Sequence, residues 1–488
     1  MSQCATLLVL ASLPLAAAAQ RTPRNPKDPA IAKLQMDIPG WMEQGDVPGL
    51  SVAVLRHGRA EWIHGFGVAN KENARAVDEN TIFNIASLSK TVFSYAVLRL
   101  VDQGKLDLDT PLTHYLPDRI VDDARLDAIT ARIVLSHRTG FPNWRPNGGK
   151  LQILFTPGER FSYSGEGMVY LSKVVEAVSG KPLNDVMQEQ VFTPLGMTAS
   201  SYIAEPAAAE HFSTAYSADG KAVPLFQSKT ANAAASLNTS AHDYALFLEA
   251  ILAGRGLKPA TLRQMETPQI AVDPECTNCT TRVPKKLATD LFWGLGWGIE
   301  KNATGTYLWH WGDNGVYKAY VVVDIKRRSA LFMAANGQNG LSVAKAITVE
   351  ALGGEHPSFT WLKYDAYDSP NLQFTRALHT RGVAPTMQDF APQLAKGEIS
   401  EGAVNSAGYM LLREKKYPEA IEVLKQNVTL HPASSNGYDS LGEAYMDAGE
   451  KDLAIKSYEK ALELDPGASG AKAMLAKLRA TPDSPTTH

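Results

Sequence analysis

The chain lacks several features that would assign it to other classes of protein. Its formal net charge is −3 and it contains no basic run, which argues against nucleic acid as a partner. Beyond the N-terminus, no stretch approaches 18 uninterrupted apolar residues, so no membrane span is expected. No Gly-x-Ser-x-Gly sequence occurs, which disfavours a Ser-His-Asp triad on a nucleophile elbow. Cysteine numbers three in 488 residues, with no further zinc ligands at the usual spacing, so neither a metal nor a cofactor is expected.

The N-terminus has the pattern of an export signal. An apolar stretch at residues 7–19 ends in three alanines, although no lysine or arginine precedes it. This predicts a signal peptide over 1–19, a spacer over 20–37, and a soluble, secreted or periplasmic mature protein. That mature chain keeps only Cys276 and Cys279, with two residues between them. A small-loop disulfide between them is one possibility in an oxidising compartment, and the sequence leaves it open.

A Ser-x-x-Lys motif, from Ser87 to Lys90, lies at the start of a predicted helix. Apolar residues recur at helical spacing from Phe93 to Val101, and Gly104 ends the pattern. Residues three apart on a helix share one face, with Cβ atoms about 5–6 Å apart, so the lysine could act as a base for the serine. Burial or a neighbouring cation would have to lower the lysine pKa first. An isolated match of this length is more often a helix cap followed by a surface lysine.

Two later motifs favour the catalytic interpretation. Tyr163 lies in Phe-Ser-Tyr-Ser-Gly after a turn signal, and His310 and Gly312 lie in Trp-His-Trp-Gly within a β-like run. This order of motifs resembles that of the penicillin-recognising serine hydrolases, which include class C β-lactamases, D-alanyl-D-alanine carboxypeptidases and related esterases. The resemblance covers roughly residues 38–352. It extends to framework segments at 133–140, 155–158, 194–197 and 294–298.

The resemblance implies a mechanism and a set of site residues. Ser87 would attack a carbonyl to form an acyl-enzyme, and Lys90 and Tyr163 would share the role of general base. A tyrosine can serve as a base only if a nearby cation, such as Lys90, stabilises its phenolate. The backbone N–H groups of Ser87 and Asp313 would form the oxyanion hole. Gly312 would keep a side chain from crowding the substrate against the strand.

Two departures from the family pattern argue against a β-lactam substrate. Gly165 stands where β-lactamases and carboxypeptidases usually carry an asparagine, whose amide contacts the lysine and the substrate. His310 replaces a lysine that helps to bind a substrate carboxylate, and imidazole is a weaker anchor for an anion near neutral pH. Both changes favour an ester or an atypical amide.

Four other residues invite a functional interpretation. For His137, before a Gly-Phe-Pro turn, a structural hydrogen bond is the expected role. Glu166 is expected to be a solvated or helix-starting residue. Trp309 and Trp311 could line a substrate cleft or pack within an amphipathic strand, and both alternatives stay open.

The hydrolase part, residues 38–354, is expected to have an α/β fold. The predicted elements are strands at 51–55, 60–68, 307–323 and 328–335, and helices at 168–179 and 241–252. In the resembling family, terminal segments build an antiparallel sheet flanked by helices, and a middle segment forms a helical subdomain. The active site lies in the groove between them, as is common for pockets at such boundaries.

After a predicted linker at 355–365 the chain changes character. Residues 435–468 resemble a tetratricopeptide repeat, and a weaker copy lies about 34 residues earlier. The repeat positions are filled by Leu441, Gly442, Tyr445, Ala454, Tyr458, Ala461 and Pro466, and in the weaker copy by Ala407, Gly408, Leu411, Ala420, Leu424 and Pro432. Two repeats bury little core, so helical segments at 371–396 and 471–478 are expected to complete an all-α domain over 366–480. A disordered tail is expected at 481–488.

Two functions therefore follow from the sequence. The first is a secreted serine hydrolase, of carboxylesterase, peptidase or β-lactamase-like type, acting on a small-molecule or peptide-like ester or amide. The second is a catalytically weak, penicillin-binding-like protein that binds partners through its repeats. For the repeat domain itself, a stabilising or docking role is expected, with a peptide-binding groove as the alternative.

Overall fold

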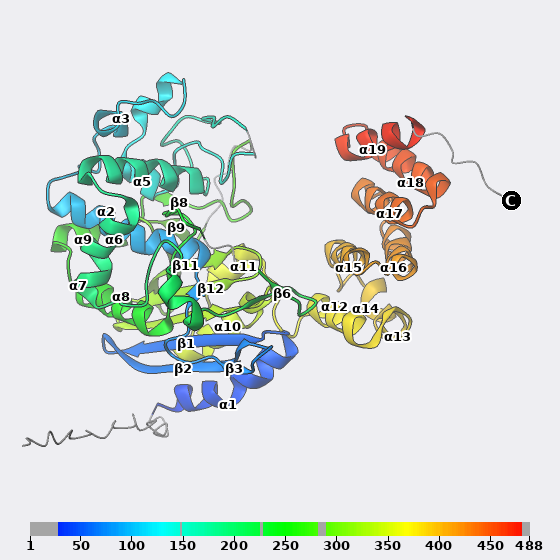
Figure 1. The fold of residues 1–488 in the computed structure, drawn as a ribbon, viewed down its shortest axis with the longest axis horizontal. Coiled ribbons are helices and arrows are strands. Elements are labelled where there is room, and N and C mark those ends of the chain that lie inside the picture. The colour runs from blue at the N-terminus through cyan, green and yellow to red at the C-terminus, as the bar shows by residue number, and fades with distance from the viewer. Residues whose placement is uncertain (1–27, 147–148, 225–227, 282–288, 481–488) are drawn as a thin grey trace, which may run out of the picture.

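The structure, a computed structural model, describes residues 28–146, 149–224, 228–281 and 289–480. The part that the sequence predicts to be a hydrolase, called the catalytic part below, is built around one sheet and is followed by a C-terminal array of helices (Figure 1). The predicted signal peptide at 1–19 and the predicted tail at 481–488 lie outside the described residues and stay predictions. Within the described part, no helix has the length and apolar character needed to cross a membrane.

The catalytic part contains a nine-stranded sheet in which every neighbouring pair is antiparallel. The strand order is β3-β2-β1-β13-β12-β11-β10-β9-β8. Strand β1, from the start of this part of the chain, therefore pairs with β13, from its end. The strands are β1 (Gly49–Arg56), β2 (Arg59–Asn70), β3 (Arg75–Ala76), β8 (Ile270–Ala271), β9 (Leu291–Trp293), β10 (Gly298–Asn302), β11 (Gly305–Asp313), β12 (Lys318–Asp324) and β13 (Ser329–Ala335). This confirms the predicted α/β architecture with an antiparallel sheet.

The predicted hairpin between β1 and β2 is present and turns at His57 and Gly58, whose φ angles of 53° and 79° lie in the left-handed region. The prediction of one strand over 307–323 was wrong. This segment is a hairpin of β11 and β12, and the Asn314 side chain accepts a hydrogen bond from the Tyr317 N–H at 2.8 Å within its turn. Two-residue strands elsewhere form the small pairs β4 (Phe83–Asn84) with β7 (Asn238–Thr239), and β5 (Ala215–Tyr216) with β6 (Ala222–Val223).

Helices cover both faces of the sheet, because successive residues of a strand point to opposite sides. On β1, Ala53 and Leu55 face a core shared with α2 (Ser89–Asp102), α5 (Gly165–Ser179) and α8 (Ala241–Ala253). Val52 and Val54 face a second core under α1 (Pro29–Gln44), α10 (Ala344–Leu352) and α11 (Pro357–Leu362). The remaining helices of this part are α3 (Leu112–Tyr115), α4 (Ala131–Leu135), α6 (Leu183–Met187), α7 (Thr193–Leu195) and α9 (Pro259–Glu266).

Part of the predicted spacer over 20–37 is helical and belongs to the fold. Helix α1 begins at Pro29 after Asp28, whose side chain accepts a hydrogen bond from the Ala30 N–H. Ile31 and Leu34 are fully buried in the second core. Each such side chain contributes about 1.5–3 kcal/mol. The prediction missed this helix because Pro29 was counted with the prolines before it, whereas proline suits the first turn of a helix.

The predicted linker at 355–365 also packs against the catalytic part. It contains α11, whose Ser358 and Trp361 are buried. The Trp361 indole donates to the main-chain oxygen of Asp273 at 2.9 Å, and the buried Glu300 carboxylate accepts from the Ser358 N–H at 3.1 Å. Helix α11 therefore holds the end of this segment, including Tyr364, against the sheet.

The C-terminal part is all helical, as predicted. Its helices are α12 (Pro370–Arg381), α13 (Val383–Asp389), α14 (Ala391–Ala395), α15 (Glu401–Arg413), α16 (Tyr417–Leu430), α17 (Ser435–Asp447), α18 (Lys451–Leu464) and α19 (Ser469–Ala480). In each of the two repeat pairs, α15 with α16 and α17 with α18, the helices pack closely at a glycine. A Cβ atom on Gly408 would lie 2.6 Å from the Leu424 side chain, and one on Gly442 would lie 2.9 Å from Tyr458. The repeat signal thus has the packing basis expected of it.

The two parts meet where α12 contacts the end of α1. The Arg376 guanidinium pairs with Asp46 at 3.1 Å, and the Gln373 amide donates to the main-chain oxygen of Gln44 at 3.1 Å. Tyr367 stacks on Trp41 with ring centroids 5.9 Å apart. These contacts are mostly polar and exposed, which is typical of an interface between domains.

Candidate active site

Ser87 lies on the short 3-10 helix η1 (Ala86–Leu88) that leads into α2. It is the one residue of the segment 81–90 that is not buried. Ala86 before it has φ of 47°, a conformation that costs a non-glycine residue about 1–3 kcal/mol. Its N–H donates to the Asn84 side chain at 3.0 Å, which holds this turn in place. The strained turn therefore presents the serine to solvent at the start of a helix.

Lys90 lies one turn further along, with its side chain fully buried. Its Nζ atom is 3.0 Å from Ser87 Oγ and donates to the main-chain oxygen of Ala234 at 2.7 Å. Burial lowers the pKa of the Lys90 amine to about 7. The two conditions for Lys90 to act as a base are thus met: its amine lies close to Ser87 Oγ, and its pKa is lowered.

Tyr163 is buried against the same lysine, whose Nζ lies 4.8 Å from the centre of the ring. The hydroxyl lies near Ser87 without a direct hydrogen bond to it. Burial raises the pKa of the Tyr163 hydroxyl well above its usual range, and this outweighs the opposite effect of Ser87. The idea that a charged Lys90 would stabilise a Tyr163 phenolate does not fit this site, because burial disfavours charge on both groups.

His310 is carried into this site by β11 and is fully buried. Burial, and then the nearby Lys90, lower the pKa of His310 to about 3. Its Nδ1 lies 2.8 Å from the Trp311 carbonyl, which can only accept, so Nδ1 carries the proton and Nε2 is a bare acceptor. Nε2 has no hydrogen-bond partner among the described residues. A neutral His310 offers no positive charge to an anion. This agrees with the expectation that His310 binds an anion more weakly than a lysine would.

His137 has the structural role that the sequence predicted. Its Nδ1 accepts a hydrogen bond from the Ser164 N–H at 3.1 Å, and its ring packs 4.3 Å from that of Tyr163. Burial, and next the nearby Lys90 and His310, lower the pKa of His137 well below its usual value. His137 is therefore a neutral side chain that supports the tyrosine.

The end of β11 lies against the turn that carries Ser87. Pairing with β10 ends at Trp309, so His310–Asp313 pair with β12 on one side and face η1 on the other. A Cβ atom on Gly312 would lie 2.2 Å from the Ile85 carbonyl oxygen. Glycine is needed here for the backbone before Ser87, and its role in keeping a side chain away from the substrate stays a prediction.

The Asp313 side chain is held by two partners. Lys318 of β12 forms an ion pair with it, and Tyr364 donates to its other carboxylate oxygen at 2.6 Å. Burial alone would raise the pKa of Asp313, but Lys318 and Tyr364 hold it below its usual value. Tyr364 comes from the predicted linker, and no sequence motif pointed to it.

Gly165, the first departure from the family pattern, is covered by the indole of Trp144. A Cβ atom on Gly165 would lie 2.8 Å from two ring carbons of Trp144 and 3.0 Å from the main-chain oxygen of Asn143. Both oxygens of Asn143 accept from the Gly165 N–H at 3.0 Å. The chain therefore has no room for the usual asparagine side chain, since an aromatic ring occupies its place.

The remaining candidates divide between support and packing. Glu166 starts α5 as expected but is buried rather than solvated, in a two-pronged pair with Arg145. Trp309 is a fully buried packing residue. Trp311 packs beside Tyr163 with ring centroids 4.8 Å apart, so it borders the site.

Two features that hold the site in place were not predicted from the sequence, because their contacts join segments far apart in the chain. The Asn84 side chain is hydrogen-bonded to Asn238 of β7 at 3.1 Å and to Asn314 of the β11–β12 turn at 2.8 Å, which ties the turn before Ser87 to both. Cys276 and Cys279 are joined in a disulfide, and the carbonyl within this small loop, at Thr277, accepts from the Tyr163 N–H at 2.9 Å. The disulfide possibility thus holds, and the loop supports the tyrosine.

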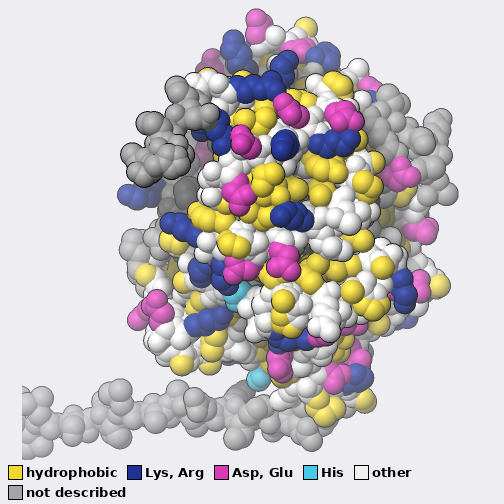
Figure 2. Space-filling model, turned by 90° about the vertical axis from the view of Figure 1, so that its right-hand side faces the viewer, with side chains coloured by type: hydrophobic (Ala, Val, Ile, Leu, Met, Phe, Trp, Pro, Cys, Tyr) yellow, Lys and Arg dark blue, Asp and Glu magenta, His cyan; other side chains and the backbone are white. Residues whose placement is uncertain are grey.

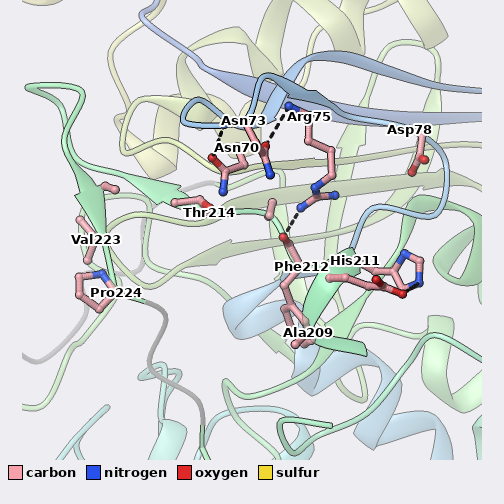
Figure 3. A pocket seen from close by; sticks show the side chains of 13 residues that line it. Asn70, Asn73, Arg75, Asp78, Ala209, His211, Phe212, Thr214, Val223 and Pro224 are labelled. Atoms are coloured by element: carbon pink, nitrogen blue, oxygen red, sulfur yellow. Dashed lines mark hydrogen bonds and ion pairs between the residues drawn. The ribbon is translucent and has the colours of Figure 1, made fainter. Parts of the chain in front are cut away.

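A separate cavity of about 820 Å³ lies at the β3 edge of the sheet (Figure 3). Arg75 crosses it to donate to the Phe212 carbonyl, and none of the predicted site residues lines it. Across the residues that the structure describes, no group of three or more His, Cys, Asp or Glu side chains is arranged to hold a metal ion.

An antiparallel sheet flanked by helices, with a serine, a buried lysine and a tyrosine gathered beside one strand end, defines the penicillin-recognising class of serine hydrolases. Residues 35–355 match the family model described as beta-lactamase, so the chain belongs to that family. Residues 440–467 match the model of a tetratricopeptide repeat.

Named relatives share the catalytic part. "Esterase EstB" of Burkholderia gladioli is 29% identical over 271 residues, which cover 44% of this chain and 68% of that protein. A "Beta-lactamase" of Pseudomonas fluorescens is 28% identical over 220 residues, covering 43% of this chain and 61% of that protein. Among solved structures, the octameric penicillin-binding protein homologue from Pyrococcus abyssi superposes with a TM-score of 0.56 at 24% identity, covering 71% of this chain and 81% of that one. This last likeness concerns the fold.

Proposed function

We propose that this protein hydrolyses an ester or amide through an acyl-enzyme on Ser87, as a carboxylesterase, peptidase or β-lactamase-like enzyme. The observation that carries the proposal is the position of Lys90 Nζ, 3.0 Å from Ser87 Oγ in a fully buried environment. An amine with a pKa of about 7 is about half unprotonated at neutral pH, so it can take a proton. A surface lysine at the same spacing would stay protonated.

The proposed reaction has two half-reactions. Ser87 Oγ attacks the carbonyl carbon while its proton passes to Lys90 Nζ, and the bond to the leaving group breaks as that group takes up the proton. Water then attacks the acyl-serine, gives one proton to Lys90, and releases the acid as the proton returns to Ser87. One ester and one water become one acid and one alcohol.

Tyr163 acts in this scheme as a neutral hydroxyl rather than as a phenolate. Its raised pKa suits a group that passes a proton between Lys90 and the leaving group. The bare Nε2 of His310 is a hydrogen-bond acceptor in the same buried site. The oxyanion would be bound by the backbone N–H groups of Ser87 and Asp313.

An ester is the substrate class that the site supports best. Gly165 and Trp144 leave no place for the asparagine that contacts a β-lactam amide, and His310 lacks the charge for a carboxylate. Lys318 could supply a charge nearby, but it is paired with Asp313.

Export to the periplasm or the outside of the cell is part of the proposal. It rests on the apolar segment before the described residues and on the disulfide between Cys276 and Cys279, which suits an oxidising compartment. Fractionation of cells that express the full chain would test it. Recovery of an unprocessed protein in the cytoplasm would contradict it.

The C-terminal helices are proposed to bind a protein partner. The repeat match supports this, as does the surface on that side of the molecule, where apolar patches lie between side chains of both charges (Figure 2). The predicted catalytic residues Ser87, Lys90 and Tyr163 all lie outside these helices, so this proposed role is separate from hydrolysis.

The decisive experiment compares the wild-type protein with Ser87→Ala. Wild type should be labelled by a fluorophosphonate probe and should hydrolyse a short-chain nitrophenyl ester, whereas the variant should lose about 10⁴-fold or more in turnover. Ser89→Ala is the matched control, because it removes another serine of the same motif. The probe should still label Ser87 in this variant. Wild-type turnover by Ser87→Ala would remove Ser87 as the nucleophile. A folded wild type that neither labels nor turns over would favour the alternative, a penicillin-binding-like protein that serves only to bind.

A further inference from the structure

Two aromatic side chains near Tyr163 remain exposed to solvent: the Trp144 ring lies against Gly165, and Tyr364 bonds to Asp313. The large hydrophobic side chains that are most exposed in the described part of the chain are Met36, Trp144, Leu154, Val349, Tyr364 and Leu453. The aromatic members of this set are Trp144 and Tyr364, and both lie next to the site around Tyr163. Exposed aromatic surface at a single functional site is typical of a binding surface.

The residues on both sides of Trp144 are held by hydrogen bonds, and the Trp144 side chain is 46% exposed. The residue before it, Asn143, accepts from the N–H groups of Gly165 and Glu166 at 3.0 and 3.1 Å. The residue after it, Arg145, is fixed by Glu166 through its backbone N–H at 3.0 Å and its guanidinium. The indole edge rests on Gly165, two residues after Tyr163. A ring carried by backbone that is already held loses less conformational entropy when a substrate packs against it.

Tyr364 lies near Tyr163 and is 38% exposed. Its hydroxyl is tied to Asp313 at 2.6 Å, and Lys318 Nζ lies 5.7 Å from the centre of its ring. Burial and the Asp313 carboxylate raise the pKa of this hydroxyl, and Trp311 and Tyr163 are near enough to affect it as well. Tyr364 is therefore neutral and fixed, with its ring at the rim of the site.

The charges around these two rings are already satisfied. Arg145 is paired with Glu166 at 2.6 Å, Lys318 is paired with Asp313, and His310 is neutral. A substrate carboxylate would meet the Asp313 and Glu166 carboxylates, each held by its own cation, and would gain no unpaired cation from these residues. An uncharged, flat, apolar group gains ring contacts on either side without this cost.

We propose that Trp144 and Tyr364 form two walls that select an uncharged ester carrying an aromatic group next to the scissile bond. The proposal rests on the proposed function, because it assigns the substrate class of the same Ser87 site. Each wall acts on specificity by packing against the substrate and takes no part in proton transfer. The usual asparagine would make an amide contact with the substrate, and this chain has Gly165 in its place. In the proposal, an apolar contact with the Trp144 ring takes over from that amide contact.

The test measures kcat and KM for two matched pairs of esters: ethyl acetate against phenyl acetate, and nitrophenyl acetate against nitrophenyl phenylacetate. Trp144→Ala and Tyr364→Ala should each lower the aromatic preference, as the ratio of kcat/KM within at least one pair, by about tenfold, which corresponds to the burial of one aromatic contact. The change should appear mainly in KM. Trp144→Phe and Tyr364→Phe should restore most of the ratio, since they keep a ring. Leu453→Ala, an exposed apolar residue on α18, is the matched control and should change nothing.

Labelling of Ser87 by a fluorophosphonate probe separates this proposal from the proposed function. If the alanine variants still label and their aromatic ratios equal that of wild type, the walls do not select the substrate although the enzyme assignment stands. Equal losses on both members of every pair would likewise overturn the proposal, because they would indicate a general defect. A nitrophenyl ester of a dicarboxylic acid, with one free carboxylate, should be a poorer substrate than nitrophenyl acetate in wild type. Preference for this charged ester would overturn the proposal.

Discussion

The Lys90 side-chain nitrogen donates a hydrogen bond to the main-chain oxygen of Ala234 at 2.7 Å while it lies 3.0 Å from Ser87 Oγ. The carbonyl orients the amine without placing a negative charge beside it. A carboxylate in that position would raise the lysine pKa, whereas a neutral acceptor leaves burial as the dominant effect. Lys90 is thus positioned and deprotonated by different features of the same site.

The pH dependence of hydrolysis should follow the Lys90 amine. Because the unprotonated amine takes the serine proton, kcat/KM should rise as pH rises through about 7 and then level off. A pH profile of ester hydrolysis between pH 5 and about 9 checks this. A rate that stays constant down to pH 5 would show that another group is the base.

The buried Lys90 should also make stability depend on pH. In the unfolded chain the amine keeps its usual pKa of 10.5, whereas burial lowers the pKa in the folded protein to about 7. The unfolded state therefore binds more protons between these values, so the free energy of unfolding should increase as pH rises across this window. Lys90→Met should be inactive, and the part of this slope that comes from residue 90 should disappear. Urea unfolding at several pH values measures the slope, and an identical slope in the variant would contradict the assignment.

Lys90 and Tyr163 should behave as one unit. Lys90→Ala and Tyr163→Phe should each reduce turnover severely, and the double variant should be little worse than either single variant, since groups in one proton path are strongly non-additive. Circular dichroism of all three variants controls for folding. Losses that multiply in the double variant would show that the two side chains act independently.

Esters should be hydrolysed faster than β-lactams. The missing amide contact at Gly165 costs the transition state about 1–3 kcal/mol, so kcat/KM for the best ester should exceed that for a penicillin or cephalosporin at least about fivefold. Comparable turnover of a cephalosporin would show that Gly165 and His310 do not exclude this substrate class.

Substitution at Gly165 tests whether the Trp144 ring limits the space beside this residue. Gly165→Ala places a methyl group 2.8 Å from the Trp144 ring and should lower ester turnover, because the indole must move. The same change in a Trp144→Gly background should have a smaller effect, since the obstructing ring is gone. Equal effects in both backgrounds would indicate that the Asn143 oxygen, rather than the ring, limits the space.

Deletion of residues 366–488 should leave turnover of a small ester largely intact. The truncated chain keeps α11 and Tyr364 but loses α12, whose contacts with Asp46 and Gln44 are exposed and polar. The cost should appear as a lower Tm or lower solubility. A shorter deletion of 397–488, which keeps α12, provides the matched control. A truncated protein that stays folded but loses most of its activity would show that the C-terminal part completes the site.

Local sequence was enough to predict much of this molecule. The Ser-x-x-Lys spacing determined that Ser87 and Lys90 share a helix face, since the spacing of a helix is set by its own backbone. Alternating and helical patterns likewise predicted β1, β2, α5, α8 and the helix pairs of the repeats. The departures at Gly165 and His310 were visible in the chain itself.

Tertiary structure decided what depends on segments far apart in the chain. The Lys90 pKa follows from its burial, and the position of its amine from Ala234, which lies 144 residues away. The covering of Gly165 by Trp144, and the reach of Tyr364 to Asp313, depend on how loops pack, and no periodic pattern encodes such contacts. Burial and long-range hydrogen bonding are collective properties of the fold, so the charge state of the site and the shape of its walls became visible only in three dimensions.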